Sequence, residues 1–136
     1  MREIKFRGKT EIHFPDNKGN VVIPKDKWIY GGIVYDTDRI WIDTPYYGQI
    51  IVNKDTIGQY TGLHDKNGKE IYEGDIIQYE DITKGLVRYS EKYAQYVLVN
   101  TGSVKDEFEP LGDYNIEVFE IIGNEYDNPE LLEKGE

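Results

Sequence analysis

The feature of this sequence that most constrains its fold is a dense group of turn-forming residues between positions 57 and 77. Asn67-Gly68 follows Asp65 and separates two apolar runs. Because both residues of an Asn-Gly pair accept positive φ at little cost, this pattern is the strongest short-range signal for a β-hairpin. Glu73-Gly74-Asp75 interrupts the apolar pattern again and predicts a tight turn. The residues expected to form these structural turns are Asp65, Asn67, Gly68, Gly74 and Asp75.

Short segments with β-branched residues, aromatic residues or alternating polarity lie on both sides of this hairpin, and they predict strands. The segments are residues 3–7, 21–23, 28–30, 33–35, 39–43, 49–52, 69–72, 75–80, 85–89, 93–100 and 115–122. Gly31-Gly32 indicates either a two-residue hairpin or a bulge. Residues 101–113 are predicted to be a loop, and residues 128–133 a single helical turn with Asn128 as its cap. The core is expected to include Ile71, Ile76, Val87, Val97, Val118 and either Ile121 or Ile122.

These patterns predict a mainly β fold, a single small domain of antiparallel strands. We expect an SH3-like, barrel-type meander in the C-terminal half and a short C-terminal helical turn. A length of 136 residues favours one domain over residues 1–136. Within it we expect N-terminal strands in residues 1–54, the hairpin and small barrel in 55–133, and a tail in 134–136.

Three stretches of this chain resemble the YopX family of phage and prophage proteins. They are residues 59–63 (QYTGL), 65–76 (DKNGKEIYEGDI) and 122–132 (IGNEYDNPELL), and the opening residues 4–7 (IKFR) are similar to the start of that family. The resemblance implies a phage or prophage origin and a shared fold. It implies no mechanism, because the family has no established activity.

Composition limits the chemistry that this chain can perform. The sequence contains no cysteine, which excludes disulfides and thiolate metal sites, and no apolar run approaches the length of a membrane span. We therefore expect a cytoplasmic protein without membrane contact. The net charge is −10, but residues 1–54 hold 9 Lys and Arg against 7 Asp and Glu, whereas residues 55–136 hold 7 against 19. Such acidity repels phosphate backbones and makes nucleic acid an unfavourable partner.

Candidate catalytic and metal-binding residues are each better explained by turn structure. His13 and His64 are 51 positions apart and form no zinc spacing, and residues 16–20 and 65–70 lack the ligands of a calcium loop. Glu73 and Asp75 could pair as acid and base, but we expect Asp75 to accept backbone hydrogen bonds in the turn. The sequence therefore predicts no enzyme activity, no metal and no cofactor.

One group of residues suggests an interaction surface. Tyrosines and cations lie close together along neighbouring predicted strands: Tyr79, Lys84, Arg88, Tyr89, Lys92, Tyr93 and Tyr96. The group is consistent with cross-strand packing, with a protein interface, or with stacking on single-stranded nucleic acid.

Two functional hypotheses follow from this group. The first is an accessory protein that assembles with itself or binds a host or phage protein, and the second is a nucleic-acid-binding small barrel. The 12 Tyr and 2 Trp, together with few devices that protect strand edges, favour a homo-oligomer.

Overall fold

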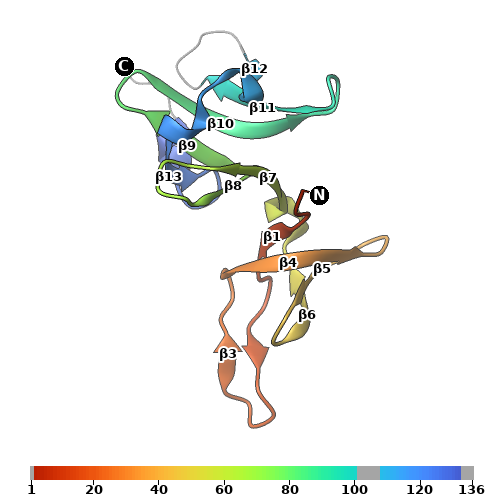
Figure 1. Cartoon of the computed structure of the whole chain (residues 1–136). Helices are drawn as coiled ribbons and strands as arrows, with labels where there is room; N and C mark the ends of the chain where they lie inside the picture. The colour runs from red at the N-terminus through yellow and green to blue at the C-terminus, as the bar shows by residue number, and fades with distance from the viewer. Residues whose placement is uncertain (1, 101–107, 133–136) are drawn as a thin grey trace. The chain divides into compact units, whose positions relative to one another are not determined.

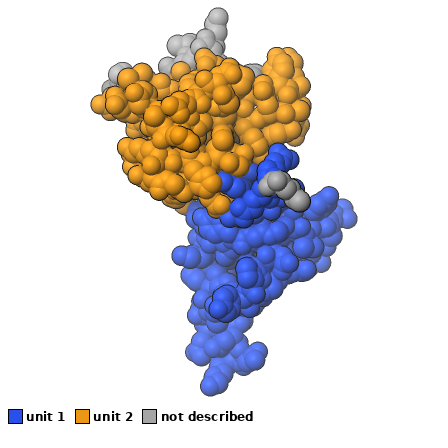
Figure 2. Space-filling view, viewed as in Figure 1, with its two compact units in different colours: residues 1–60 blue, residues 61–136 orange. Residues whose placement is uncertain are grey.

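The computed structural model describes residues 2–100 and 108–132, and within them the chain consists of antiparallel strands joined by turns and short 3-10 helices (Figure 1). The predicted mainly β class is therefore confirmed. The chain forms two compact units, residues 1–60 and 61–136, which Figure 2 shows in different colours. The division falls at residue 60, six positions after the boundary expected from the sequence, and the assignment to one domain stays a prediction.

The first unit is built on a curled sheet. Its elements are β1 (Phe6–Lys9), β2 (Phe14–Pro15), β3 (Val21–Ile23), β4 (Trp28–Tyr35), β5 (Ile40–Thr44), β6 (Gly48–Val52), η1 (Lys54–Thr56) and the start of β7 (Gly58–His64). The strands follow the order β6-β5-β4-β1-β7, while β2 and β3 form a separate ribbon. One isolated bridge joins Thr10 to Val52. The core of this unit contains Ile23, Ile29, Ile42, Ile50 and Val52.

The Gly31-Gly32 pair forms neither a hairpin nor a bulge, because it lies inside the continuous strand β4. The first half of β4 pairs with β1, where Gly31 faces Phe6, and the second half pairs with β5, where Gly32 faces Asp43. A Cβ atom on Gly31 would lie only 2.2 Å from the backbone oxygen of Asp43. Glycine is needed here so that two backbones can approach closely where the strand changes partner.

The second unit contains a five-stranded sheet. Its elements are the end of β7, β8 (Glu70–Tyr72), β9 (Asp75–Tyr79), β10 (Thr83–Ser90), β11 (Gln95–Asn100), β12 (Phe108–Pro110), η2 (Leu111–Asp113), η3 (Ile116–Val118), β13 (Glu120–Asn124) and η4 (Pro129–Leu132). The strand order is β12-β11-β10-β9-β13, and β8 pairs with β7. The expected meander of β9, β10 and β11 is present. The core contains Ile71, Ile77, Val87, Leu98, Leu111, Ile116 and Phe119.

The predicted barrel-type closure is not found in the described part of the chain. The two edge strands, β12 and β13, do not pair with each other there, so the sheet is open and the SH3-like detail is not confirmed. Two features account for this. β12 is three residues long and ends at Pro110, which has no N–H to donate, and the outer edge of β13 is bonded to the Asp65 hairpin.

Four of the predicted core residues, Ile71, Ile76, Val87 and Val97, are buried, and Ile121 packs against the core. Val118 was predicted wrongly, because it is 41% exposed. The reason is that residues 115–122 do not form one strand. The 3-10 helix η3 precedes β13, and its three-residue period buries Ile116 and Phe119 while it turns Val118 outward.

Several other boundaries differ from the prediction. The first strand begins at Phe6, and residues 108–113 form β12 and η2 rather than a loop, while the rest of that predicted loop, residues 101–107, lies outside the described residues. The predicted C-terminal helical turn is present as η4. Among the described residues, no helix has the length and apolar character needed to cross a membrane.

Candidate interaction surface

The hairpin formed by β10 and β11 holds four of the seven residues predicted to form an interaction surface. Tyr89 and Tyr96 face each other across the two strands, with ring centroids 5.3 Å apart at an angle of 76°. Tyr93 lies in the turn, where its backbone N–H donates to Ser90 Oγ, and the ammonium of Lys92 is 5.2 Å from its ring centroid. We call Tyr89, Lys92, Tyr93 and Tyr96 the tyrosine surface. Tyr89 is 44% exposed and Tyr93 is 52% exposed.

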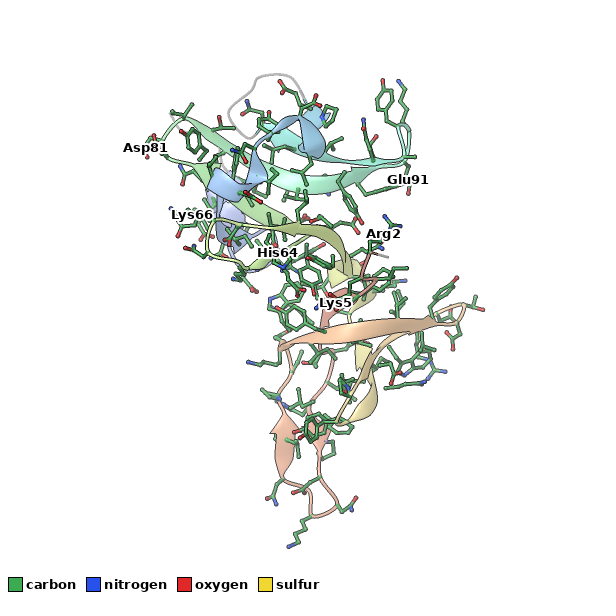
Figure 3. The ribbon with its side chains drawn as sticks, in the orientation of Figure 1. Arg2, Lys5, His64, Lys66, Asp81 and Glu91 are labelled. Atoms are coloured by element: carbon green, nitrogen blue, oxygen red, sulfur yellow. The ribbon has the colours of Figure 1, made fainter. Side chains whose placement is uncertain are left out.

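The structure does not bring the other three residues to this surface. Tyr79 lies opposite Thr83 at the far end of β10, and its ring is 5.9 Å from that of Phe119, so it packs on the core. Figure 3 shows the two ends of β10, marked by Asp81 at the turn before it and Glu91 at the turn after it. The seven residues were grouped because they are close in sequence, but the eight-residue strand β10 places Tyr79 and the exposed tyrosines at opposite ends.

Lys84 and Arg88 lie on the other face of β10 from Tyr89, because successive side chains of a strand alternate. A guanidinium nitrogen of Arg88 is 3.5 Å from a carboxylate oxygen of Glu125. The local basic cluster seen in the sequence is therefore divided between two faces and two ends of the strand. Only Lys92 remains beside the exposed tyrosines.

The hairpin at residues 65–69 is formed by an Asp-centred turn. The N–H groups of Asn67 and Lys69 both donate to Asp65 Oδ1 at 2.9 Å, and Gly68 N–H donates to the Asp65 carbonyl at 3.0 Å. Gly68 has φ of 79°, whereas Asn67 has no positive φ. The turn is therefore a type I turn followed by a left-handed glycine, not a two-residue turn in which both residues have positive φ.

The same turn occurs at residues 16–20. The N–H groups of Lys18 and Asn20 donate to Asp16 Oδ1 at 2.8 and 2.9 Å, Gly19 N–H donates to the Asp16 carbonyl at 3.1 Å, and Gly19 has φ of 84°. In both turns the aspartate carboxylate organises the loop through backbone donors. This geometry explains the two stretches that superficially resembled calcium loops.

Asp65 differs from Asp16 in one long-range bond. Its second carboxylate oxygen accepts from Ile121 N–H at 3.1 Å, and Lys66 N–H donates to the Phe119 carbonyl at 2.8 Å, so the hairpin bonds the outer edge of β13. Burial alone would raise the pKa of the Asp65 carboxyl, but hydrogen bonds from Ile121, Lys69 and Asn67 lower it below its ordinary value. The folded protein therefore favours the ionised form of the Asp65 carboxyl.

The Glu73-Gly74-Asp75 turn is also fixed by hydrogen bonds. Asp75 Oδ2 accepts from Tyr72 N–H at 2.8 Å, Gly74 N–H donates to the Val87 carbonyl, and the Gly74 carbonyl accepts from Glu125 N–H. Gly74 has φ of 92°, which favours glycine. Asp75 is 2% exposed, and its carboxylate orders this turn as expected from the sequence.

A fourth turn follows β13. Asn124 Oδ1 accepts from the N–H groups of Tyr126 and Asp127, and Asn128 Oδ1 accepts from Asn124 N–H at 3.2 Å. The Asn128 side chain therefore bonds backward, to Asn124, instead of forward into η4 as the predicted cap would do. A Cβ atom on Gly123 would lie 2.5 Å from Asn128 Oδ1, so glycine leaves room for this contact.

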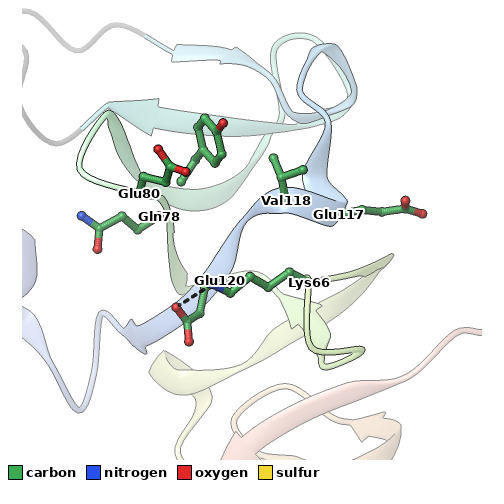
Figure 4. Close-up of a pocket in the computed structure, with 7 residues that line it drawn as sticks. Lys66, Gln78, Glu80, Glu117, Val118 and Glu120 are labelled. Carbon is green, nitrogen blue, oxygen red and sulfur yellow. Dashed lines mark ion pairs between the residues drawn. The ribbon is translucent and has the colours of Figure 1, made fainter.

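Sequence reasoning missed two hollows in the second unit. The first, about 520 Å³, lies between the end of β9, η3 and the hairpin, and it is lined by Lys66, Gln78, Tyr79, Glu80, Glu117, Val118 and Glu120. Figure 4 shows the ion pair between Lys66 and Glu120 at its lower side, where the two charged atoms are 3.3 Å apart. Three glutamates against one paired lysine make this hollow acidic. Its residues come from separate segments, so no local pattern could have predicted it.

The second hollow, about 480 Å³, is next to His64 and includes Leu63, Tyr114 and Glu117. The hydroxyl of Tyr114 donates to Glu109 Oε2 at 2.9 Å; burial, followed by this contact, raises the pKa of Tyr114. In the first unit, His13 Nδ1 accepts from Lys25 N–H. Within residues 2–100 and 108–132, no three histidine or acidic side chains form a group that could hold a metal ion.

The fold and these turns define a class of small β protein, with open antiparallel sheets and loops ordered by aspartate, asparagine and glycine. Residues 12–133 match the model of one protein family, described as YopX protein. The match covers nearly the whole chain, including all four turns, so the chain belongs to the YopX family. A comparison with curated proteins gives no match.

Proposed function

We propose that this YopX-family protein is a non-enzymatic phage or prophage accessory protein that acts in the cytoplasm of the bacterial host. It acts by contact with protein, either a second copy of itself or a host or phage protein, through the tyrosine surface. The observation that carries the proposal is the exposure of Tyr89 and Tyr93 at one end of an ordered hairpin.

Neighbouring side chains fix the positions of two rings of the tyrosine surface before any partner binds. Tyr96 packs against the core and supports Tyr89 edge to face, and each of these rings has only two rotatable side-chain bonds to fix. Tyrosine provides apolar area together with a hydroxyl, and it is enriched at protein interfaces. This arrangement supports an interface more directly than it supports catalysis, because the turn aspartates are occupied by backbone donors.

Sedimentation equilibrium at about micromolar protein in moderate salt tests self-assembly. We expect a mass above that of the 15.9 kDa monomer, and a shift toward the monomer when Tyr89 and Tyr93 are both changed to Ser. Tyr46→Ser is the matched control, because Tyr46 is 92% exposed and lies in the first unit. A mass near the monomer at every concentration would reject self-assembly and leave binding to a different protein.

The alternative function is a small nucleic-acid-binding protein that uses Lys84, Arg88 and Lys92 with the tyrosines. The placement of Lys84 and Arg88 away from the tyrosine surface, and the Arg88–Glu125 ion pair, favour the protein interface over this alternative. Salt distinguishes the two. Affinity for a single-stranded oligonucleotide would fall steeply with ionic strength, whereas a tyrosine-anchored protein contact would change little.

A further inference from the structure

The Asp65 turn contains a pair of residues, Asn67 and Gly68, whose chemical reactivity is separate from the hydrogen bonds that form the turn. Asn67 is the only asparagine in the sequence that precedes a glycine, and both residues are exposed to water. The backbone nitrogen of the residue after an asparagine can attack the side-chain Cγ, and glycine offers the least steric resistance because it has no Cβ atom. Nothing lies within 4 Å of the place where a Cβ atom on Gly68 would be.

The chemistry is balanced without any other reactant than water. Gly68 N gives up its proton to water and bonds to Asn67 Cγ. The bond from Cγ to Nδ2 then breaks, and Nδ2 takes up a proton from water and leaves as ammonia. Water then opens the resulting five-membered imide at either carbonyl. One product is an ordinary aspartate at position 67, and the other is an isoaspartate whose backbone is longer by one methylene.

The folded turn opposes this reaction at its first step. Gly68 N–H donates to the Asp65 carbonyl at 3.0 Å, so the proton that must leave is held in a hydrogen bond. On either side, Asp65 Oδ1 fixes Asn67 N–H and Lys69 N–H at 2.9 Å. Attack requires Gly68 N to lose its bond and to turn toward the Asn67 side chain. The reaction therefore proceeds from an opened turn.

We propose that Asn67 is a site of spontaneous deamidation, and that the Asp65 turn slows this modification in the folded protein. Conversion to isoaspartate lengthens the loop between Asp65 and Lys69, which disturbs the bonds that close it. Because Asp65 Oδ2 also accepts from Ile121 N–H, the modification loosens the contact between the hairpin and β13. The Asp65 turn thus contains the site of deamidation and also slows that reaction.

Peptide mass spectrometry during incubation at mildly alkaline pH tests the proposal. The folded protein is compared with the same protein in guanidinium chloride at the same pH and temperature. We expect deamidation at Asn67 to be at least about tenfold slower in the folded protein, which corresponds to about 1.4 kcal/mol of local opening. The other asparagines, none of which precedes glycine, are internal references in the same digest.

Three variants separate the site from its restraint. Asn67→Lys removes the reactive amide while it keeps a residue that the equivalent turn carries at Lys18, so both products should disappear. Asp65→Ala should raise the Asn67 rate toward that of the unfolded protein, whereas the matched variant Asp16→Ala should leave it unchanged. If Asp65→Ala does not fold, the comparison of folded with unfolded wild-type protein still decides.

Two outcomes would overturn the proposal. The absence of deamidation at Asn67 in the unfolded chain would remove the site, and equal rates in the folded and unfolded states would remove the restraint. Hydrogen exchange adds a readout of the consequence. The Ile121 amide should exchange faster in the isoaspartate fraction than in the unmodified fraction, and equal exchange would reject the loosening of β13.

Discussion

Asp65 uses both oxygens of one carboxylate, one for its own turn and one for a strand 56 positions away. The twin turn at Asp16 lacks the bond to a distant strand, and its second oxygen accepts from the Asn20 side chain. The two residues therefore allow the local role of an aspartate to be separated from its tertiary role. The sequence makes them look equivalent, and the contact with Ile121 distinguishes them.

Asp65→Asn should destabilise the protein by about 1–3 kcal/mol, because the new side-chain NH₂ would face Ile121 N–H and leave this partly buried donor unsatisfied. Asp16→Asn keeps the oxygen that accepts from Lys18 and Asn20, so its effect should be smaller. Urea unfolding of the two variants provides the comparison. Equal losses of stability would show that the bond to β13 contributes nothing.

The stabilisation from Asp65 should depend on pH with a defined sign. Its pKa is lowered in the folded state, so the stabilisation is fully present above the ordinary pKa of aspartate, near 3.9, and is lost as the pH falls through the folded pKa. The stability difference between wild type and Asp65→Asn should therefore be constant near neutral pH and shrink on acidification below about pH 4. A difference that grows on acidification would contradict this assignment.

Gly68→Val should destabilise by about 1–3 kcal/mol, because a β-branched residue resists the φ of 79° that this position has. The open space around Gly68 means that the loss comes from the backbone and not from a clash. Thermal unfolding measures it. Gly112→Val is a matched control, since a Cβ atom there also meets nothing within 4 Å and Gly112 has no positive φ. Equal effects of the two changes would show that φ is not the cause.

At the scale of elements, the segment from Asn115 to Asn124 shows how two periodicities meet. Alternation predicted one strand with Val118 inside, but η3 follows a three-residue period before β13 begins. Ile116 and Phe119 then fall on one side and join Leu98 and Leu111 in the core. A short apolar stretch fits either period, so neighbouring elements decide which one forms.

Ile116→Ala should cost about 2–5 kcal/mol, because Ile116 is 6% exposed and its loss leaves a cavity in the core. Val118→Ala should change stability by less than about 0.5 kcal/mol, as expected for an exposed side chain. Chemical unfolding of the two variants tests the 3-10 assignment. The reverse order of effects would restore the continuous strand that the sequence suggested.

At the scale of the whole molecule, the uneven distribution of charge is a property of sequence that the two units retain. The second unit, residues 61–136, contains most of the acidic residues of a chain whose net charge is −10. The ion pairs described within it include Lys66 with Glu120 and Arg88 with Glu125. In this unit the carboxylates therefore outnumber the lysines and arginines that could neutralise them.

Raising the ionic strength should stabilise the protein, because salt screens the repulsion among the excess carboxylates more than it weakens a few exposed pairs. The measurement is the urea midpoint in sodium chloride between low and moderate concentration, well below the range in which salts act by surface exclusion. A midpoint that falls with salt would mean that the ion pairs contribute more to stability than the net charge opposes it.

The turns and the β class could be predicted from the sequence because they depend on neighbouring residues. Asp65 and Gly68, Gly74 and Asp75, and the apolar residues of β9 and β10 have local conformational preferences that act before any tertiary contact. The hairpin, the meander and the burial of Ile71, Ile76, Val87 and Val97 were therefore foreseen. The resemblance to the YopX family was drawn from stretches that include these motifs, and the match over residues 12–133 confirms the family.

Only the tertiary structure decided the rest, because it depends on residues that are distant in the chain. The bond from Asp65 to Ile121 covers the outer edge of β13, a protection that the sequence did not indicate. The sheet stays open because β12 is short and ends at Pro110, and because the hairpin bonds β13. Strand length and alternation separated Tyr79, Lys84 and Arg88 from the tyrosine surface. Closeness in sequence sets which residues share a strand, whereas pairing and packing set which of them share a surface.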